Sequence, residues 1–187
     1  KGVLKLTAAD AKAGFAGIEA MKKNFRRLET MGRPVVALLN GLGYVFIARI
    51  DSGGALAWAT YLGDSSEDRS ARIIRDPGGQ VRVIGTTASE STIATAGVPL
   101  EELQGATDVF ITKFDTTGHR LWGAYFGGPG ADEGTDIAVF DVNIMFFTGT
   151  TSSGSGIFDM GVREALSGTT DAFIARFQQH NWNSGDS

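Results

Sequence analysis

The sequence predicts a mainly β protein built from repeated units, and three observations carry this prediction. Residues 108–151 lie without a gap on residues 44–87 when the chain is shifted by 64 positions, and thirteen of the 44 aligned pairs are identical. A third copy begins at residues 171–177, which is 63 positions after the second. Glycine is frequent, with 26 residues, as is typical of a chain with many tight turns. A fixed period with glycine and aromatic landmarks indicates a repeat architecture.

Each copy is expected to form four short strands that are separated by turns rich in glycine, serine, aspartate and proline. The predicted strands are 44–50, 56–62, 70–76 and 81–87 in the first copy, and 108–114, 120–126, 134–140 and 144–150 in the second. The polar loop between the copies, 88–107, is expected to hold a helical turn around Leu100–Leu103. Evenly spaced strands in groups of four predict the antiparallel four-stranded blades of a β-propeller, here a partial one because closure needs about 4–8 blades.

The opening strands alternate in a way that predicts burial on both faces. In residues 108–114, Phe110, Thr112 and Phe114 point to one side, and Val109, Ile111 and Lys113 point to the other. Because both sets are mostly apolar, the sheet is expected to pack between two neighbours.

Residues 1–43 lie outside the repeat and predict a short α/β segment. A strand near Val3–Leu6, a helix over about 11–31 and a strand at Val35–Leu39 outline a βαβ unit that packs outside the repeats or is foreign to them. The chain is therefore divided into this segment (1–43), a first blade repeat (44–107), a second blade repeat (108–170), and the start of a third with a polar tail (171–187).

Composition excludes several classes of function. The formal net charge of −4 argues against nucleic acid as a partner, which requires a basic surface. The sequence contains no cysteine, which excludes disulfides and thiolate metal sites. No apolar run approaches the roughly 18–20 residues that span a bilayer, so membrane insertion is not expected. The chain begins at Lys1 without a signal peptide, as expected for a fragment or a processed chain.

Residues 44–177 resemble the SBBP beta-propeller repeat of bacterial proteins. The resemblance rests on the opening strands DVFITKFD (108–115) and DAFIARF (171–177), on LWGAYFGG (121–128), and on the later DEG and TGTT. Proteins with this repeat are generally exported or lie on the cell surface. The resemblance therefore implies an extracellular or cell-surface location. Because every landmark residue recurs as a structural element and none forms a unique reactive group, the expected function is a non-enzymatic scaffold that takes part in protein–protein interactions.

Residues 1–43 resemble a fragment of the enoyl-CoA hydratase/isomerase (crotonase) family. The matching pieces are FAGIEAM (15–21) and FRRLETMGRPVVALLNG (25–41). In that family two backbone N–H groups form an oxyanion hole, which by resemblance would be at Gly17 and just after Gly41. The alternative function is therefore an acyl-CoA-binding enzyme fragment. A further alternative is a composite sequence of two families, joined at about residues 42–44.

The acidic turn GGPGADEGTD (127–136) has two interpretations. Asp132, Glu133 and Asp136 supply hard oxygen atoms that would suit Ca²⁺. The alternative is that Asp132, like Asp68 in the first copy, caps backbone N–H groups in a tight turn. The sequence favours the turn, so no cofactor and no metal-binding residue are assigned.

Three other sets of residues are of types that occur in binding or catalytic sites, and none forms a reactive group. The aromatic pairs would suit sugar stacking, but their recurrence favours core packing; they are Trp58/Tyr61 and Trp122/Tyr125. The recurring basic residues would suit an anion-binding ring, but protection of a strand edge is the commoner role; they are Arg49, Lys113 and Arg176. His119 and His180 have no matching partners. No catalytic residue is therefore predicted.

The repeat count predicts an assembled protein. With two copies and one further strand, the end blades are expected to expose apolar residues such as Phe110, Ile111, Phe114 and Phe173. The strand at 171–177 is expected to lack the three strands that pair beside it. The expected partners are other protein subunits or the missing remainder of a longer chain.

Overall fold

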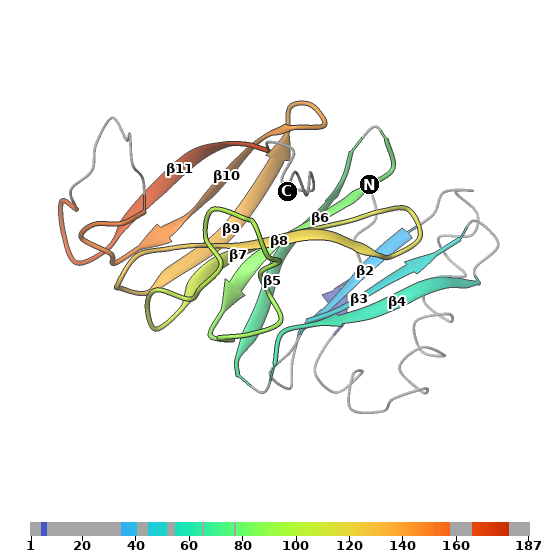
Figure 1. Ribbon diagram of the computed structural model, residues 1–187, viewed down its shortest axis with the longest axis horizontal. Coiled ribbons are helices and arrows are strands. Elements are labelled where there is room, and N and C mark those ends of the chain that lie inside the picture. The colour runs from blue at the N-terminus through green and yellow to red at the C-terminus, as the bar shows by residue number, and fades with distance from the viewer. Residues whose placement is uncertain are drawn as a thin grey trace.

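The computed structural model describes residues 5–6, 35–40, 45–51, 55–64, 66–76, 78–157 and 166–179, with the backbone alone for 5–6 and 35–40 (Figure 1). Over these residues the chain forms strands and no helix, which confirms the mainly β prediction. The strands are β1 (Lys5–Leu6), β2 (Val35–Asn40), β3 (Val45–Ile50), β4 (Leu56–Leu62), β5 (Asp68–Arg75), β6 (Val81–Thr87), β7 (Asp108–Phe114), β8 (Arg120–Phe126), β9 (Asp132–Val139), β10 (Ile144–Thr151) and β11 (Asp171–Gln178). Each predicted strand of the two copies is present to within a few residues.

The strands form three sheets, in the orders β1-β2-β3-β4, β5-β6-β7-β8 and β11-β10-β9. All pairs from β2 to β11 are antiparallel, and β1 pairs with β2 in parallel. Figure 1 shows the sheet β5–β8 between the other two. The three sheets stack in chain order, so each contacts the one that follows it.

The central sheet combines strands from both copies. Strands β5 and β6 come from the first copy, and β7 and β8 come from the second. The two halves join where β6 pairs with β7, from Val81 opposite Phe114 to Thr87 opposite Asp108. The third sheet is built the same way, because β10 of the second copy pairs with β11 of the third. One copy of the repeat therefore supplies strands to two sheets. The expectation that β11 lacks three neighbouring strands is wrong, because β10 and β9 lie beside it.

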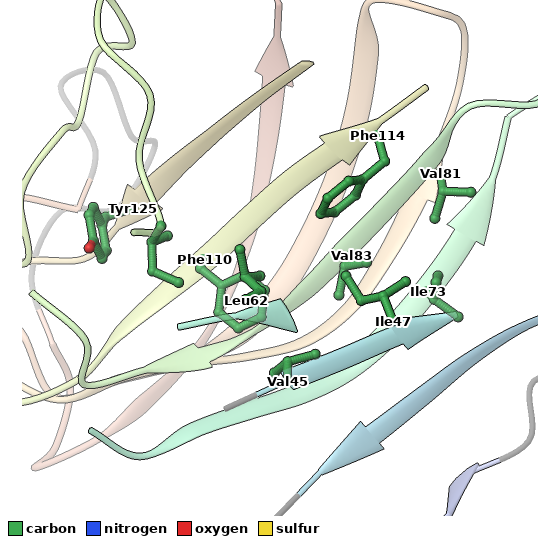
Figure 2. Close-up of a cluster of buried hydrophobic side chains, with 10 residues drawn as sticks. Val45, Ile47, Leu62, Ile73, Val81, Val83, Phe110, Phe114 and Tyr125 are labelled. Carbon is green, nitrogen blue, oxygen red and sulfur yellow. The ribbon is translucent and has the colours of Figure 1, made fainter. Parts of the chain in front are cut away.

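Strand β7 is buried over its whole length, as its alternating apolar pattern predicted. Phe110 and Phe114 join a cluster with Val45 and Ile47 of the first sheet, which Figure 2 shows in close-up. On the other face, Val109 and Ile111 join a cluster with residues of β9, β10 and β11. The expectation that Phe110, Ile111 and Phe114 are exposed is therefore wrong, because each face of the central sheet is covered by a neighbour.

The described residues of 1–43 show no separate α/β segment. Strand β2 joins the first sheet, where it pairs with β3 from Val35 opposite Ile50 to Asn40 opposite Val45. Strand β2 thus lies beside β3 as β6 lies beside β7. The prediction that residues 1–43 pack outside the repeats is therefore wrong for the residues of β2. The connection from β1 to β2, which a parallel pair requires, and the helix predicted over 11–31 lie outside the described residues.

The loop 88–107 runs beside β8 and contains no helical turn, contrary to prediction. Thr95 N donates to Gly123 O at 3.0 Å, and Tyr125 N donates to Leu100 O at 3.1 Å. Ile93 and Val98 are buried there. The loop therefore supplies hydrogen-bond partners to backbone groups of the edge strand β8.

Glycine recurs in the sheets where an aromatic ring from the neighbouring strand lies against the backbone. Gly85 of β6 lies opposite Phe110 of β7, and Gly149 of β10 lies opposite Phe173 of β11. A Cβ at Gly85 would stand 2.7 Å from Phe110 Cε1 and 2.8 Å from Ser70 Cα; at Gly149 it would stand 2.6 Å from two atoms of the Phe173 ring. The glycine of the repeated Gly-Thr-Thr sequence (85–87 and 149–151) therefore makes room for the ring.

We predict that Gly85→Ala destabilises the protein by roughly 1–3 kcal/mol, because the added methyl group must displace a buried ring and strand backbone. Gly154→Ala is the matched control, since a Cβ there meets nothing within 4 Å. Urea denaturation measures both changes. Equal stability of the two variants would contradict the role of glycine at position 85.

Candidate functional site

The three residues proposed for Ca²⁺ do not converge. Asp132 is buried, whereas Glu133 and Asp136 are exposed. Successive side chains of a strand point to opposite faces, which separates Asp132 from Glu133. Asp136 forms an ion pair instead, with 3.3 Å between its Oδ1 and Arg72 Nε. Within the part of the chain that the structure describes, no three carboxylate, histidine or cysteine side chains are placed to hold a metal ion.

Asp132 belongs to a hydrogen-bonded network that closes the turn before β9. Its Oδ2 accepts from Gly128 N at 2.8 Å and from Ser153 Oγ at 2.7 Å, which confirms the capping interpretation. In the first copy, Asp68 accepts from Ser89 Oγ at 2.8 Å and from Thr87 Oγ1.

The serine of this network is positioned by a threonine two residues earlier. Ser153 N donates to Thr151 Oγ1, and Ser89 N donates to Thr87 Oγ1, each at 2.9 Å. Sequence reasoning missed both serines. The sequence feature that could have identified them is the Thr-x-Ser pattern, which occurs at the same place in both copies, at 87–89 and 151–153.

Aspartate caps the other turns of the repeat as well. In the hairpins, Asp51, Asp115, Asp76 and Asp141 accept from backbone N–H groups of Ala55, His119, Gln80 and Ile144. Before β7 and β11, Asp108 Oδ2 accepts from Gln104 N and Asp171 Oδ2 accepts from Ser167 N. These carboxylates fix turn geometry, which accounts for their recurrence without any chemistry.

Asp108 and Asp132 bring two carboxylates together in the interior. Both are fully buried, and the Oδ1 atom of each lacks a hydrogen-bond partner. Asp132 Oδ2 lies 2.9 Å from the point that a Cβ of Gly127 would occupy, and Asp108 Oδ1 lies closer still. Burial, with a smaller contribution from Asp132, raises the pKa of Asp108 to about 6. Burial also raises the pKa of Asp68.

The aromatic pairs differ between the copies. Trp122 is buried, and Tyr125 is 1% exposed with its hydroxyl donating to Ser89 O at 2.8 Å. Burial raises the pKa of Tyr125 to about 12. These two residues are therefore core, as predicted. Tyr61, the equivalent of Tyr125, is 65% exposed, while Trp58 is half-buried against Phe114.

The recurring basic residues connect neighbouring sheets. Arg49 Nη1 donates to Thr116 O, and Lys113 Nζ donates to Gln179 Oε1 at 3.1 Å. Thr116 and Gln179 hold equivalent places after β7 and β11. The prediction that these residues protect strand edges is wrong for Arg49 and Lys113, because β3 and β7 are interior strands. Arg176 is exposed on the edge strand β11 and donates to Gln178 Oε1 at 3.0 Å.

A buried ion pair lies near Lys113. Arg82 Nη1 and Asp76 Oδ2 are 3.0 Å apart, and Arg82 Nη2 also donates to Val142 O, in the turn between β9 and β10, at 2.6 Å. Burial lowers the pKa of Lys113, and the charge of Arg82 lowers it further. Through the contact of Arg82 with Val142 O, the Arg82–Asp76 pair joins the β5–β6 hairpin to the β9–β10 hairpin.

His119 lies in the exposed β7–β8 turn, where its Nδ1 is 2.9 Å from Thr117 Oγ1 and 3.6 Å from Asp115 Oδ2. All three belong to one capped turn. His180, Gly17 and Gly41 lie outside the described residues. Asn40 ends β2 opposite Val45, and only its backbone is described.

The chain matches no model of a known protein family and no curated protein. A search of the described residues for a helix long and apolar enough to cross a bilayer finds none. The polar groups described above make turn caps and contacts between sheets.

We predict that Asp108 makes stability fall as pH rises from about 4 to 6. Its carboxyl has a pKa of about 6 when folded and about 3.9 when unfolded, so the folded state retains a proton that the unfolded chain loses. Each pKa unit corresponds to about 1.4 kcal/mol. Asp108→Asn keeps a cap for Gln104 N and removes the charge. At pH 7.5 we expect it to stabilise the protein by roughly 1–3 kcal/mol and to reduce the pH dependence.

Asp171→Asn is the matched control, because Asp171 caps the equivalent turn at a half-buried position. Urea denaturation from pH 4 to 7.5 measures both variants. A wild-type stability that is flat over this range, or an unchanged slope in Asp108→Asn, would contradict the assignment.

Proposed function

We propose that the chain is a non-enzymatic β-propeller scaffold of an exported or cell-surface bacterial protein, and that it acts in protein–protein interaction. The observation that carries the proposal is that contacts between sheets recur with the period of the sequence. The location is supported by the resemblance of residues 44–177 to the SBBP repeat. The proposal includes no cofactor, no nucleic acid and no membrane insertion.

Propeller geometry is supported by equivalent contacts at two successive junctions. Arg49 reaches Thr116 as Lys113 reaches Gln179. The rings of Trp58 and Phe114 have centroids 6.2 Å apart, and those of Trp122 and Phe177 are 5.8 Å apart. Each sheet therefore meets the next through the same residues, as blades do in a radial array.

A role in assembly is supported by apolar side chains at the two ends of the stack. Tyr61 and Leu56 are exposed on β4, and Ile174 is exposed on β11. In a repeat protein such surfaces are covered by the next unit, which would be another subunit or the remainder of a longer chain.

We predict that static light scattering gives a mass well above the 19.7 kDa of one chain, because the end surfaces associate. A stable monomer at micromolar concentration would contradict the assembled scaffold.

The enzyme alternative has its own measurement. Equilibrium binding of a CoA thioester at micromolar concentration, lost on substitution of Gly17, would favour an acyl-CoA-binding enzyme over the scaffold. We expect no saturable binding.

A further inference from the structure

Asp108 and Asp132 each hold one oxygen atom in the interior that accepts no hydrogen bond. The Oδ2 atoms fix the two carboxylates, because Asp108 Oδ2 accepts from Gln104 N and Asp132 Oδ2 accepts from Gly128 N, each at 2.8 Å. The Oδ1 atoms are buried and have no hydrogen-bond partner. The two residues are 0% and 1% exposed, so bulk water does not reach them. Both Oδ1 atoms are therefore held in place and available to a ligand.

The backbone places these carboxylates side by side, where the central sheet meets the third sheet. Thr107 and Ala131 form a parallel bridge, and Asp132 N donates to Thr107 O at 2.8 Å. The residues that follow the bridge are Asp108, which opens β7, and Asp132, which opens β9. A Cβ at Gly127 would stand 2.3 Å from Asp108 Oδ1 and 2.9 Å from Asp132 Oδ2. Because these distances sum to 5.2 Å, the two oxygen atoms are no farther apart than that.

No basic side chain of the described residues forms an ion pair with Asp108 or Asp132. Nearby strands carry arginines, but Arg72 pairs with Asp136 and Arg82 pairs with Asp76. Burying an ionised carboxylate is costly, and buried charges in proteins are paired or coordinate metal ions. A cation between the two carboxylates would neutralise both of them.

The equivalent place in the first copy lacks this pair. Asp68 is the counterpart of Asp132, and both of its carboxylate oxygen atoms accept hydrogen bonds from side chains. The counterpart of Asp108 in the sequence is Tyr44, which has no carboxylate. The unpartnered oxygen atoms therefore occur where the repeat places two aspartates together.

We propose that Asp108 and Asp132 together bind one Ca²⁺ ion, which joins the central sheet to the third sheet. Calcium accepts oxygen ligands at about 2.3–2.6 Å, so that one ion can contact both carboxylates across a separation of at most 5.2 Å. These ligands differ from the exposed pair Glu133 and Asp136 of the same strand. The inference goes beyond the proposed function and does not depend on it.

The chemistry of the pair favours calcium over magnesium. Magnesium demands near-ideal octahedral geometry and usually retains several water molecules, which is unfavourable where both carboxylates are fully buried. Calcium tolerates irregular geometry and also accepts backbone carbonyl oxygen atoms as ligands. With two carboxylates as its charged ligands, the site is expected to have a dissociation constant of roughly 10⁻⁴–10⁻³ M.

Calorimetric titration of the full chain with CaCl₂ at pH 7.5, after treatment with EDTA and removal of the chelator, measures binding directly. The wild-type chain is expected to bind one equivalent. Asp108→Asn is expected to bind at least tenfold more weakly, because a neutral amide replaces one of the two charged ligands. Glu133→Gln and Asp136→Asn are the matched controls, since these carboxylates are exposed on the same strand, and they are expected to bind as the wild type does.

Urea denaturation at pH 7.5 gives a second measurement, on the stability of the fold. About 5 mM CaCl₂ is expected to raise the folding equilibrium constant of the wild type by about tenfold relative to EDTA, as mass action predicts for a dissociation constant of about 0.5 mM. The same concentration of MgCl₂ is expected to change it by less than about twofold. Asp108→Asn is expected to fold in EDTA and to show no response to calcium.

The alternatives give different results. A wild-type chain that binds no calcium and unfolds identically in CaCl₂ and EDTA would show that the pair shares a proton or holds a buried water molecule. Binding that persists in Asp108→Asn, or that is lost in Glu133→Gln, would place the ion at the exposed acidic residues. Equal stabilisation by MgCl₂ and CaCl₂ would indicate general screening of negative charge. Each of these results would overturn the inference.

Discussion

The burial of β7 on both faces is the constraint on which the rest of the structure depends. Phe110 and Phe114 need the first sheet, and Val109 and Ile111 need the third. Strand β7 is also paired on both edges, with β6 and with β8. Because β6 belongs to the preceding copy, a single copy cannot complete a sheet. Burial of apolar surface is worth about 25 cal/mol for each Å², so the contacts of the interior sheet with both of its neighbours stabilise the stack.

Polar residues in the described part of the chain hold the turns and connect the stacked sheets. Aspartates cap turns at fixed places in each copy, and Arg49 and Lys113 reach the next sheet. The pair Asp108 and Asp132 is the exception in energetic terms, because two carboxylates with unpartnered oxygen atoms are buried near each other. Burying an unpaired charge is costly, so Asp108 retains its proton to higher pH. The cost of burying the pair thus offsets part of the stability that the two turn caps contribute, the cap of Asp108 before β7 and that of Asp132 before β9.

The period of the sequence was enough to predict the strands and their alternation, because both depend on neighbouring residues. It did not predict which strands share a sheet, since the pairing of β6 with β7 spans the 20-residue loop 88–107. It also predicted the wrong exposure for some residues. Phe110 and Phe173 are alike in sequence, but only the strand of Phe110 lies in a sheet that is covered on both faces. The turn role of Asp132 followed from its neighbours along the chain, whereas its approach to Asp108 depends on the stacking of two sheets. No local pattern could reveal that approach.

The central claim is that the cooperative unit is the sheet and not the sequence copy. Native-state hydrogen exchange in increasing denaturant tests it most directly, because it measures the free energy of opening at each amide. The account predicts that amides of β5, β6, β7 and β8 share one opening free energy, higher than those of β4 and β11. A common value for β3 to β6, with a separate common value for β7 to β10, would contradict it.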